Sequence, residues 1–244
     1  MLIEYAPKDK RGLYASWQMA AQVATIGIAA GLVLILTTTL SRGDLESWGW
    51  RIPFAIGILI GPVGYYMRSR LADSPEFTQY IKQEGGPQKT PLREVLRNYR
   101  RESLSGAGIV LIGSASFYMI LVYLPLFAAR ELHIPMRDAQ IATIICCAVQ
   151  FFVCLAFGSL SDRFGRRAIL LPAAILYVLL CYPLFAQLIE KPSFTTLLIA
   201  QMPINILAGM ISGPMPATLA ELYPTQVRSS GIGLIYNLVG AIFG

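Results

Sequence analysis

The sequence contains two long runs without a charged side chain, residues 139–161 and 168–189, separated by a short charged segment. Each run is long enough to cross a bilayer as a helix, which takes about 20 apolar residues. Only 14% of the 244 residues are charged, whereas soluble domains average about 25%. The pattern therefore predicts an all-α integral membrane protein, in which the two runs are spans joined by a tight charged hairpin.

Other apolar runs extend this pattern along the chain. We expect about six full spans and one partial span, near residues 13–40, 52–67, 103–128, 139–161, 168–189 and 194–220, with the partial span beginning near 229. The chain divides into residues 1–72 with two spans, a polar loop at 73–102, and residues 103–244 with the remaining spans. Gly27 and Gly31 are spaced to allow a neighbouring helix to approach the first span closely.

The basic residues indicate the topology. Most of the 20 Lys and Arg residues fall in alternate loops beside the ends of spans. Cytoplasmic loops carry an excess of these residues, which places the 162–167 hairpin and the 73–102 loop in the cytoplasm. Membrane topology thus explains the net charge of +6, and we expect no nucleic acid partner.

The end of the 73–102 loop has the pattern of an amphipathic helix. Apolar and basic side chains recur there with helical spacing: Leu92, Val95, Leu96 and Tyr99 against Arg93, Arg97, Arg100 and Arg101. Such a helix is suited to an anionic leaflet, so membrane lipids are expected partners. A solvated linker helix is an equally good interpretation.

The cysteines and the histidine form no metal or redox pattern. Cys146, Cys147, Cys154 and Cys181 lie in apolar runs without a Cys-x-x-Cys pair, and His133 is on the side opposite the charged hairpin. We expect the cysteines to be small packing residues. We expect no metal, no cofactor and no enzymatic site.

A short motif occurs twice with the same spacing, each time just before a span. The copies are Glu4-x-x-Pro7-x-x-x-Arg11 and Glu221-x-x-Pro224-x-x-x-Arg228. Six spans lie between them, which is the architecture of transporters built from parallel repeats around a midplane substrate site.

The hairpin carries a family resemblance. Its residues resemble the second-half signature loop of the major facilitator superfamily, between spans 8 and 9: Gly158-x-x-x-Asp162-Arg163-x-Gly165-Arg166-Arg167. The repeated motif resembles the loops after spans 4 and 10. Residues 48–54 and the surroundings of both motif copies are similar to the metabolite:proton symporter branch, whose members carry citrate, α-ketoglutarate, shikimate or osmolytes. The resemblance implies an incomplete helical bundle in the cell inner or plasma membrane, covering about spans 5 to 11.

The signature loop and the two motif copies are the candidate gate. We expect Asp162 to form a cytoplasmic latch with Arg228, Glu221 and the N-terminus of the partial span, whose dipole favours a carboxylate. Gly158 would let two helices approach, and Gly165 would permit the turn. In the alternative interpretation the charges only set topology, and Asp162→Asn leaves transport intact.

Neutral polar side chains inside the spans are the candidate substrate contacts. Amides and phenols can hydrogen-bond carboxylates and hydroxyls without placing charge in the membrane. The candidates are Gln18, Gln22, Tyr118, Gln150, Gln201 and Asn205. For each of them, an interhelical hydrogen bond is an equally good interpretation.

A glycine–proline segment in the second predicted span, around Gly57, Gly61 and Pro62, resembles a motif of drug:proton antiporters. That motif belongs in span 5, whereas this segment falls in span 6. We therefore interpret the segment as a helix-packing feature.

The resemblance implies proton-coupled uptake of a small organic anion by alternating access, with protons as a second partner. The alternatives are symport of a zwitterionic osmolyte, which needs no positive cavity, and a truncated product without transport. An integral membrane enzyme would need convergent acids, bases or a metal, which the sequence does not provide.

Overall fold

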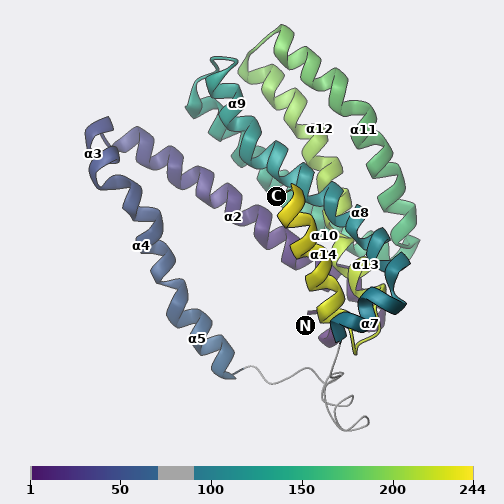
Figure 1. Ribbon diagram of the computed structural model, residues 1–244. Coiled ribbons are helices and arrows are strands. Elements are labelled where there is room, and N and C mark those ends of the chain that lie inside the picture. Colours follow the sequence, from purple (N-terminus) through teal and green to yellow (C-terminus); the bar gives the residue numbers. More distant parts are fainter. Residues whose placement is uncertain (1, 71–90, 244) are drawn as a thin grey trace.

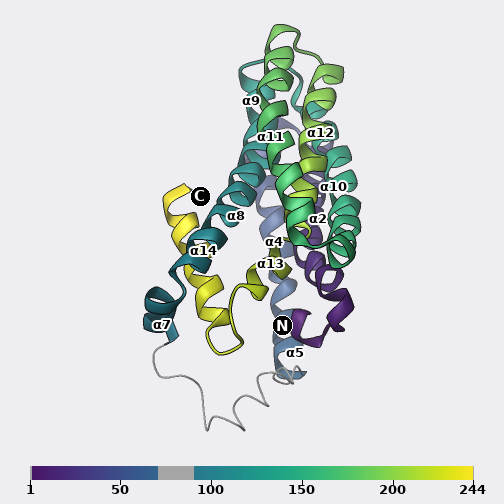
Figure 2. The ribbon, with the colours of Figure 1, turned by 90° about the vertical axis from the view of Figure 1, so that its right-hand side faces the viewer.

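The computed structural model describes residues 2–70 and 91–243, and within these ranges the chain forms helices joined by short turns (Figures 1 and 2). The helices are α1 (Leu2–Tyr5), η1 (Lys8–Lys10), α2 (Arg11–Thr39), α3 (Arg42–Ser47), η2 (Gly49–Arg51), α4 (Ile52–Ile58), α5 (Ile60–Arg70), α7 (Pro91–Asn98), α8 (Arg100–Phe117), η3 (Tyr118–Tyr123), α9 (Leu124–Arg130), α10 (Met136–Phe164), α11 (Arg166–Glu190), α12 (Phe194–Ser212), α13 (Met215–Glu221) and α14 (Arg228–Phe243).

Five of the described helical segments are long and apolar enough to cross a membrane. They are Arg11–Thr39, Arg100–Arg130, Met136–Phe164, Arg166–Glu190 and Phe194–Glu221. Each coincides with a span expected from the sequence, which confirms the all-α membrane class.

The second expected span, residues 52–67, is not one continuous helix. α4 and α5 meet at Leu59, because Pro62 has no N–H for the carbonyl of Ile58 and its ring crowds that carbonyl. All described residues from 54 to 70 are exposed, and in Figure 1 this pair runs apart from the other helices. A Cβ added at Gly57, Gly61 or Gly64 would meet no described atom within 4 Å. The packing role expected of this segment is therefore wrong for contacts within the described chain.

α2 and α10 pack antiparallel along their lengths. A Cβ added at Gly27 would lie 3.1 Å from Cys147 Cβ, and one at Gly31 would lie 4.0 Å from Ile144 Cδ1. Small residues at these positions let the two helices approach closely, which confirms the expected role of Gly27. Cys146, Cys147 and Cys154 are buried, as expected, whereas Cys181 is only partly buried.

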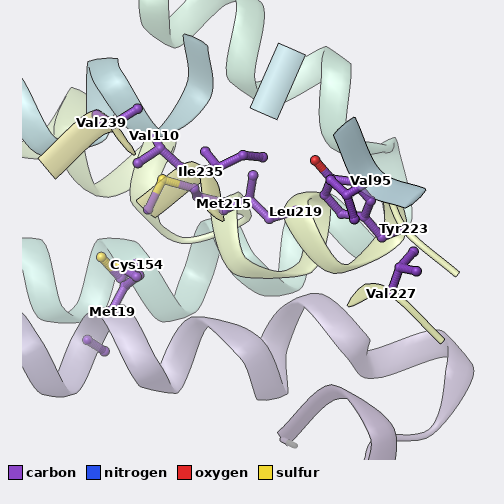
Figure 3. Close-up of a cluster of buried hydrophobic side chains, with 11 residues drawn as sticks. Met19, Val95, Val110, Cys154, Met215, Leu219, Tyr223, Val227, Ile235 and Val239 are labelled. Atoms are coloured by element: carbon purple, nitrogen blue, oxygen red, sulfur yellow. The ribbon is translucent and has the colours of Figure 1, made fainter. Parts of the chain in front are cut away.

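α13 lies at the centre of one hydrophobic cluster. Figure 3 shows Met215 and Leu219 of α13 beside Val110 of α8 and Ile235 of α14, and Tyr223 follows where α13 ends. A second cluster joins η3 and α9 to α10, α11 and α12. Together these clusters hold α8–α14 as one bundle, and α2 is attached to it mainly through α10.

The expected amphipathic helix begins at Pro91 as α7, while the earlier part of the 73–102 loop lies outside the described residues up to residue 90. Val95 is fully buried, and the ring of Tyr99 packs edge-on against Tyr223. Leu92 and Leu96 are 51% and 53% exposed. The apolar stripe is thus divided: one part anchors α7 to the bundle and the other faces outward.

Candidate functional site

Gly165 forms the turn between α10 and α11. Its φ is 86° and its ψ is 152°, a conformation that residues with a Cβ rarely adopt. α10 ends at Phe164 and α11 begins at Arg166, so one residue reverses the chain. The tight hairpin expected from the sequence is present. It places Arg166, at the start of α11, in contact with Asp162, near the end of α10.

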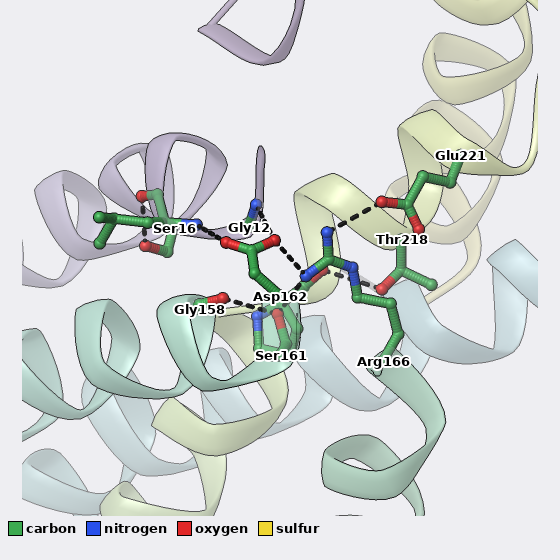
Figure 4. Close-up of polar contacts among 10 residues, drawn as sticks. Gly12, Ser16, Gly158, Ser161, Asp162, Arg166, Thr218 and Glu221 are labelled. Carbon is green, nitrogen blue, oxygen red and sulfur yellow. Dashed lines mark hydrogen bonds and ion pairs between the residues drawn. The ribbon is translucent and has the colours of Figure 1, made fainter. Parts of the chain in front are cut away.

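Asp162 caps the N-terminus of α2. Its Oδ1 accepts the N–H of Gly12 at 2.7 Å, and its Oδ2 accepts the N–H of Leu13 at 3.0 Å (Figure 4). The residue that precedes the helix, Lys10, provides no side-chain cap. A carboxylate from another helix therefore satisfies two of the free N–H groups and interacts favourably with the helix dipole.

The close approach of the two helices makes this capping possible. A Cβ at Gly12 would overlap the carbonyl oxygen of Gly158, and a Cβ at Gly158 would overlap Ser16 Cβ. Ser16 is fully buried at this contact, and its hydroxyl donates to the carbonyl of Leu13 at 2.7 Å. Gly158 therefore has the close-approach role expected of it.

Arg166 connects this cap to α13. One guanidinium nitrogen lies 2.9 Å from Asp162 Oδ1, and the other donates to Glu221 Oε1 at 2.9 Å. The same guanidinium donates to the hydroxyl of Ser161, which in turn donates to the carbonyl of Gly158 at 2.6 Å. The Asp162 side chain is only 6% exposed and Glu221 is 45% exposed, so the inner ion pair is the better shielded one.

The latch differs from its expected composition. Asp162 binds the N-terminus of α2 rather than that of the last helix, and Arg166 rather than Arg228 joins it to Glu221. Arg228 Nε donates to the carbonyl of Ala220 at 3.0 Å. The expectation was wrong because the two copies of the repeated motif both precede a helix N-terminus, and the sequence does not say which one lies opposite the hairpin.

The remaining gate candidates surround these contacts. Arg163 and Arg167 are exposed, and Pro224 accepts the N–H of Arg228 at 3.0 Å where α14 begins. In the first copy, the carbonyl of Pro7 accepts the N–H of Lys10 at 3.0 Å, and Arg11 is half-buried at the start of α2. The side chain of Glu4 lies outside the described part of the chain.

A pocket of about 320 Å³ lies between α2, α8, α10 and the α12–α14 region. Three substrate-contact candidates line it: Gln22, Tyr118 and Gln150. Gln150 is 4% exposed, and its Oε1 has no hydrogen-bond partner among the described residues. A buried amide with an unused acceptor at a pocket wall is a group that a ligand can satisfy.

The sequence did not single out all of the polar lining. Ser114, Ser116, Ser212 and Tyr236 also face this pocket. The hydroxyl of Tyr236 is buried, and no described residue bonds to it. A polar residue inside an apolar run is the available signal, and Tyr236 lies in the span that the sequence predicts to be partial. All described lining residues of this pocket are uncharged.

A second, larger pocket of about 590 Å³ opens beside the first, between α2, α13 and α14. Gln18 and Arg228 line it, and Tyr236 belongs to the walls of both pockets. The positive charge of Arg228 is therefore next to the larger pocket, and Tyr236 lies where the two pockets adjoin.

Gln201 and Asn205 line neither of these two pockets. Both are fully buried in α12. Asn205 Nδ2 donates to the carbonyl of Gln201 at 2.9 Å, and Gln201 Nε2 donates to the carbonyl of Ile120 at 3.4 Å. Their described contacts are hydrogen bonds within and between helices, the interpretation left open by the sequence.

No group of three His, Cys, Asp or Glu side chains converges in a way that could hold a metal, as far as residues 2–70 and 91–243 are concerned.

Several known proteins are similar to this chain. It is 32% identical to the citrate-proton symporter of Klebsiella pneumoniae over 243 residues, covering 100% of this chain and 54% of the relative. It is 29% identical to the proline/betaine transporter of Escherichia coli (strain K12) over 250 residues, covering 99% and 50%. It is 30% identical to the alpha-ketoglutarate permease of the same strain over 249 residues, covering 99% and 55%. The chain spans about half the length of the curated relatives it matches.

No solved structure gives a significant match. The family model described as Major Facilitator Superfamily matches residues 1–244. Its match agrees with the signature hairpin and with the helical membrane fold, and the relatives are transporters of the kinds expected for the metabolite:proton symporter branch. The chain belongs to the Major Facilitator Superfamily.

Proposed function

We propose that this chain is part of a proton-coupled secondary transporter that takes up a small organic acid, citrate or another di- or tricarboxylate, by alternating access. In this proposal α2, α4 and α5 belong to the first half of the transporter, α8–α14 belong to the second half, and the hairpin faces the cytoplasm. The observation that carries the proposal is the cap that Asp162 places on α2, because this contact would join the two halves at their cytoplasmic ends.

The latch gives the proposal its mechanism. When Asp162 and the N-terminus of α2 are joined, the cytoplasmic ends of the two halves are held together and the substrate site opens to the other side. Breaking the cap would expose two backbone N–H groups and a carboxylate to water, so the halves can separate at modest cost. The latch thus stabilises one of two states without locking it.

The pocket suits a carboxylate ligand. Gln22, Tyr118 and Tyr236 offer amide and hydroxyl donors to a carboxylate, and the unused Oε1 of Gln150 offers an acceptor to a hydroxyl of the substrate. The Arg228 side chain adds a positive charge at the adjoining pocket. A bound anion would therefore have neutral donors around it and a positive charge at the adjoining pocket.

A zwitterionic osmolyte is the alternative substrate. The uncharged lining of the 320 Å³ pocket favours it, because a ligand with no net charge needs no net positive site. The similarity to a proline/betaine transporter supports the same alternative.

The third possibility is that the 244-residue chain does not transport on its own. It covers about half the length of the relatives it matches, and a two-halved transporter needs both halves to enclose its substrate.

Uptake into proteoliposomes tests these proposals. Labelled citrate, proline and betaine would be offered to vesicles holding the 244-residue chain, and to vesicles holding the complete product of its reading frame, with and without a proton gradient. We expect citrate uptake that collapses when an uncoupler is added. Uptake that ignores the uncoupler contradicts proton coupling, and betaine or proline uptake without citrate uptake supports the osmolyte alternative.

A matched pair of variants links uptake to the pocket. Gln150→Leu removes a pocket amide and should raise the KM for uptake. Gln140→Leu removes an amide from the same helix, at a position that bonds only to Met136 Sδ among the described contacts and lines neither pocket. Equal effects of the two changes would contradict a binding role for Gln150.

A further inference from the structure

The helix that carries one wall of the pocket changes its hydrogen-bond pattern midway. Between α8 and α9, the residues of η3 form a π-helical segment. At its end the N–H of Leu124 donates to the carbonyl of Met119, five residues back. In an α-helix the same N–H would donate to Ile120, four residues back. Segments of this kind are frequent at functional sites.

Pro125 removes the other donor that Ile120 could have received. If the five-residue pattern continued, the N–H of residue 125 would reach the Ile120 carbonyl, but proline has no N–H. Neither Leu124 nor Pro125 therefore serves this carbonyl. Ile120 is 1% exposed, and an unpaired carbonyl in a water-free interior is costly.

Gln201 supplies the missing donor from a different helix. Its Nε2 donates to the Ile120 carbonyl at 3.4 Å, across the interface between α12 and η3. Gln201 is fully buried, so water does not compete for this amide. Its side chain meets a backbone carbonyl that neither Leu124 nor Pro125 serves.

We propose that Gln201 is a positioning residue, which holds η3 in its π-helical form and thereby sets the place of Phe117 and Tyr118 in the pocket wall. These two residues stand at the start of η3 and line the 320 Å³ pocket. One residue corresponds to about 100° of rotation in an α-helix. If η3 relaxed to an α-helix, Tyr118 would rotate relative to α9 by about that angle and leave the wall.

The hydrogen-bond part of this inference stands without transport, and only its consequence for substrate affinity rests on the proposed function. Its test is a double-mutant cycle on the full chain purified in detergent, with Gln201→Met and Pro125→Ala. Methionine keeps the length of glutamine without its donor, and alanine at 125 restores an N–H within reach of Ile120.

Two measurements give the coupling between Gln201→Met and Pro125→Ala. Gln201→Met should lower the midpoint of thermal unfolding by about 5 °C, because a buried carbonyl loses its partner. It should also speed amide hydrogen exchange in the peptide covering residues 118–124 roughly tenfold. In the Pro125→Ala background both effects should shrink by about half or more, because the new N–H serves the same carbonyl.

Asn205→Leu is the matched control. Asn205 is an equally buried amide one turn further along α12, but its donor bonds to Gln201 in its own helix. Its effects should not depend on Pro125→Ala. Effects of Gln201→Met that are simply additive with Pro125→Ala, or unchanged exchange in residues 118–124, overturn the proposal. If Gln201→Met does not accumulate, slower exchange of this peptide in Pro125→Ala alone supports the proposal and unchanged exchange overturns it.

Uptake supplies the readout for positioning. Gln201→Met should raise the KM for substrate more than it lowers the maximal rate, and Pro125→Ala should restore the KM. Absence of uptake by the unmodified protein would contradict the proposed function, while the exchange and unfolding results would still decide the role of Gln201.

Discussion

At the scale of single residues, the hairpin between α10 and α11 depends on two residues with opposite requirements. Asp162 must carry a charged carboxylate, because it accepts two N–H groups of α2 and an ion pair from Arg166. Gly165 must have no side chain, because of its backbone conformation. The first gives the hairpin its partner, and the second determines the path of the chain that brings Asp162 and Arg166 together.

The effect of Gly165→Ala follows from this geometry. A φ of 86° with a ψ of 152° is open to glycine but strained for alanine. A Cβ at this position would meet no described atom within 4 Å, so the cost is conformational rather than steric contact. We expect Gly165→Ala to destabilise the fold by about 1–3 kcal/mol, measured as a lower midpoint of thermal unfolding.

Gly43→Ala is the control for this prediction. Gly43 also has open space around its Cβ position, but it lies inside α3 with an ordinary helical conformation. Alanine there should be neutral or slightly stabilising. A Gly165→Ala variant as stable as Gly43→Ala would contradict the strain argument.

The latch shows which part of the site the sequence could predict. The residue types of the hairpin indicated an acid held by neighbouring cations and a helix N-terminus, and each of these is present. The identity of the partners depends on which of two similar motif copies packs against Gly158, a contact about 150 positions away in the sequence. Local patterns do not contain that information, so Arg228 was expected where Arg166 is found.

At the scale of elements, apolar length predicted the five long helices well and the second span poorly. The length of an apolar run gives no information on single backbone hydrogen bonds. Pro62 removes one such bond, and this loss divides α4 from α5. The π pattern of η3 was missed for the same reason, because it rests on the backbone partners of Leu124 and Pro125 rather than on side-chain periodicity. The polar pocket lining was partly found, since a polar residue in an apolar run is visible in the sequence.

The exposed apolar face of α7 leads to a prediction about contacts with lipids. Val95 anchors the helix to the bundle while Leu92 and Leu96 are exposed beside the basic residues Arg93 and Arg97. We expect this outward face to rest on an anionic membrane surface, with about 1 kcal/mol from each basic residue near the headgroups. Spin labels at Leu92→Cys and Leu96→Cys should then be shielded from a water-soluble relaxation agent in anionic vesicles.

The solvated-helix alternative predicts a different result. Labels at both positions would then be as accessible as one at Arg42→Cys, whose side chain is 93% exposed at the start of α3. Shielding that is lost in vesicles of neutral lipid, or in Arg93→Glu/Arg97→Glu, supports the electrostatic contribution. Shielding that is unchanged in neutral-lipid vesicles and in the double variant would contradict the electrostatic contribution.

At the scale of the whole molecule, two parts of the chain meet mainly along α2 and α10. The contact is tightest at the hairpin end, where Gly12, Ser16 and Gly158 leave no room for larger side chains. Close-packed interfaces of this kind change between discrete arrangements rather than deform gradually. In the proposed transport cycle, the cap on α2 is a polar contact that would bias this interface toward its closed arrangement.

Thiol labelling at Ser16→Cys tests this bias. Ser16 is fully buried against Gly158, so a cysteine there should react with a maleimide only when α2 leaves α10. Asp162→Asn keeps an acceptor but removes the charge that favours the α2 N-terminus, a loss of about 1 kcal/mol. Labelling should become about fivefold faster, since about 1.4 kcal/mol corresponds to tenfold.

Thr25→Cys is the control for this prediction. It lies on an exposed face of α2 and should react at the same rate with either residue at 162, after subtraction of the background from the native cysteines. Equal labelling of Ser16→Cys in both backgrounds would mean that the hairpin contributes only positive charge that sets topology.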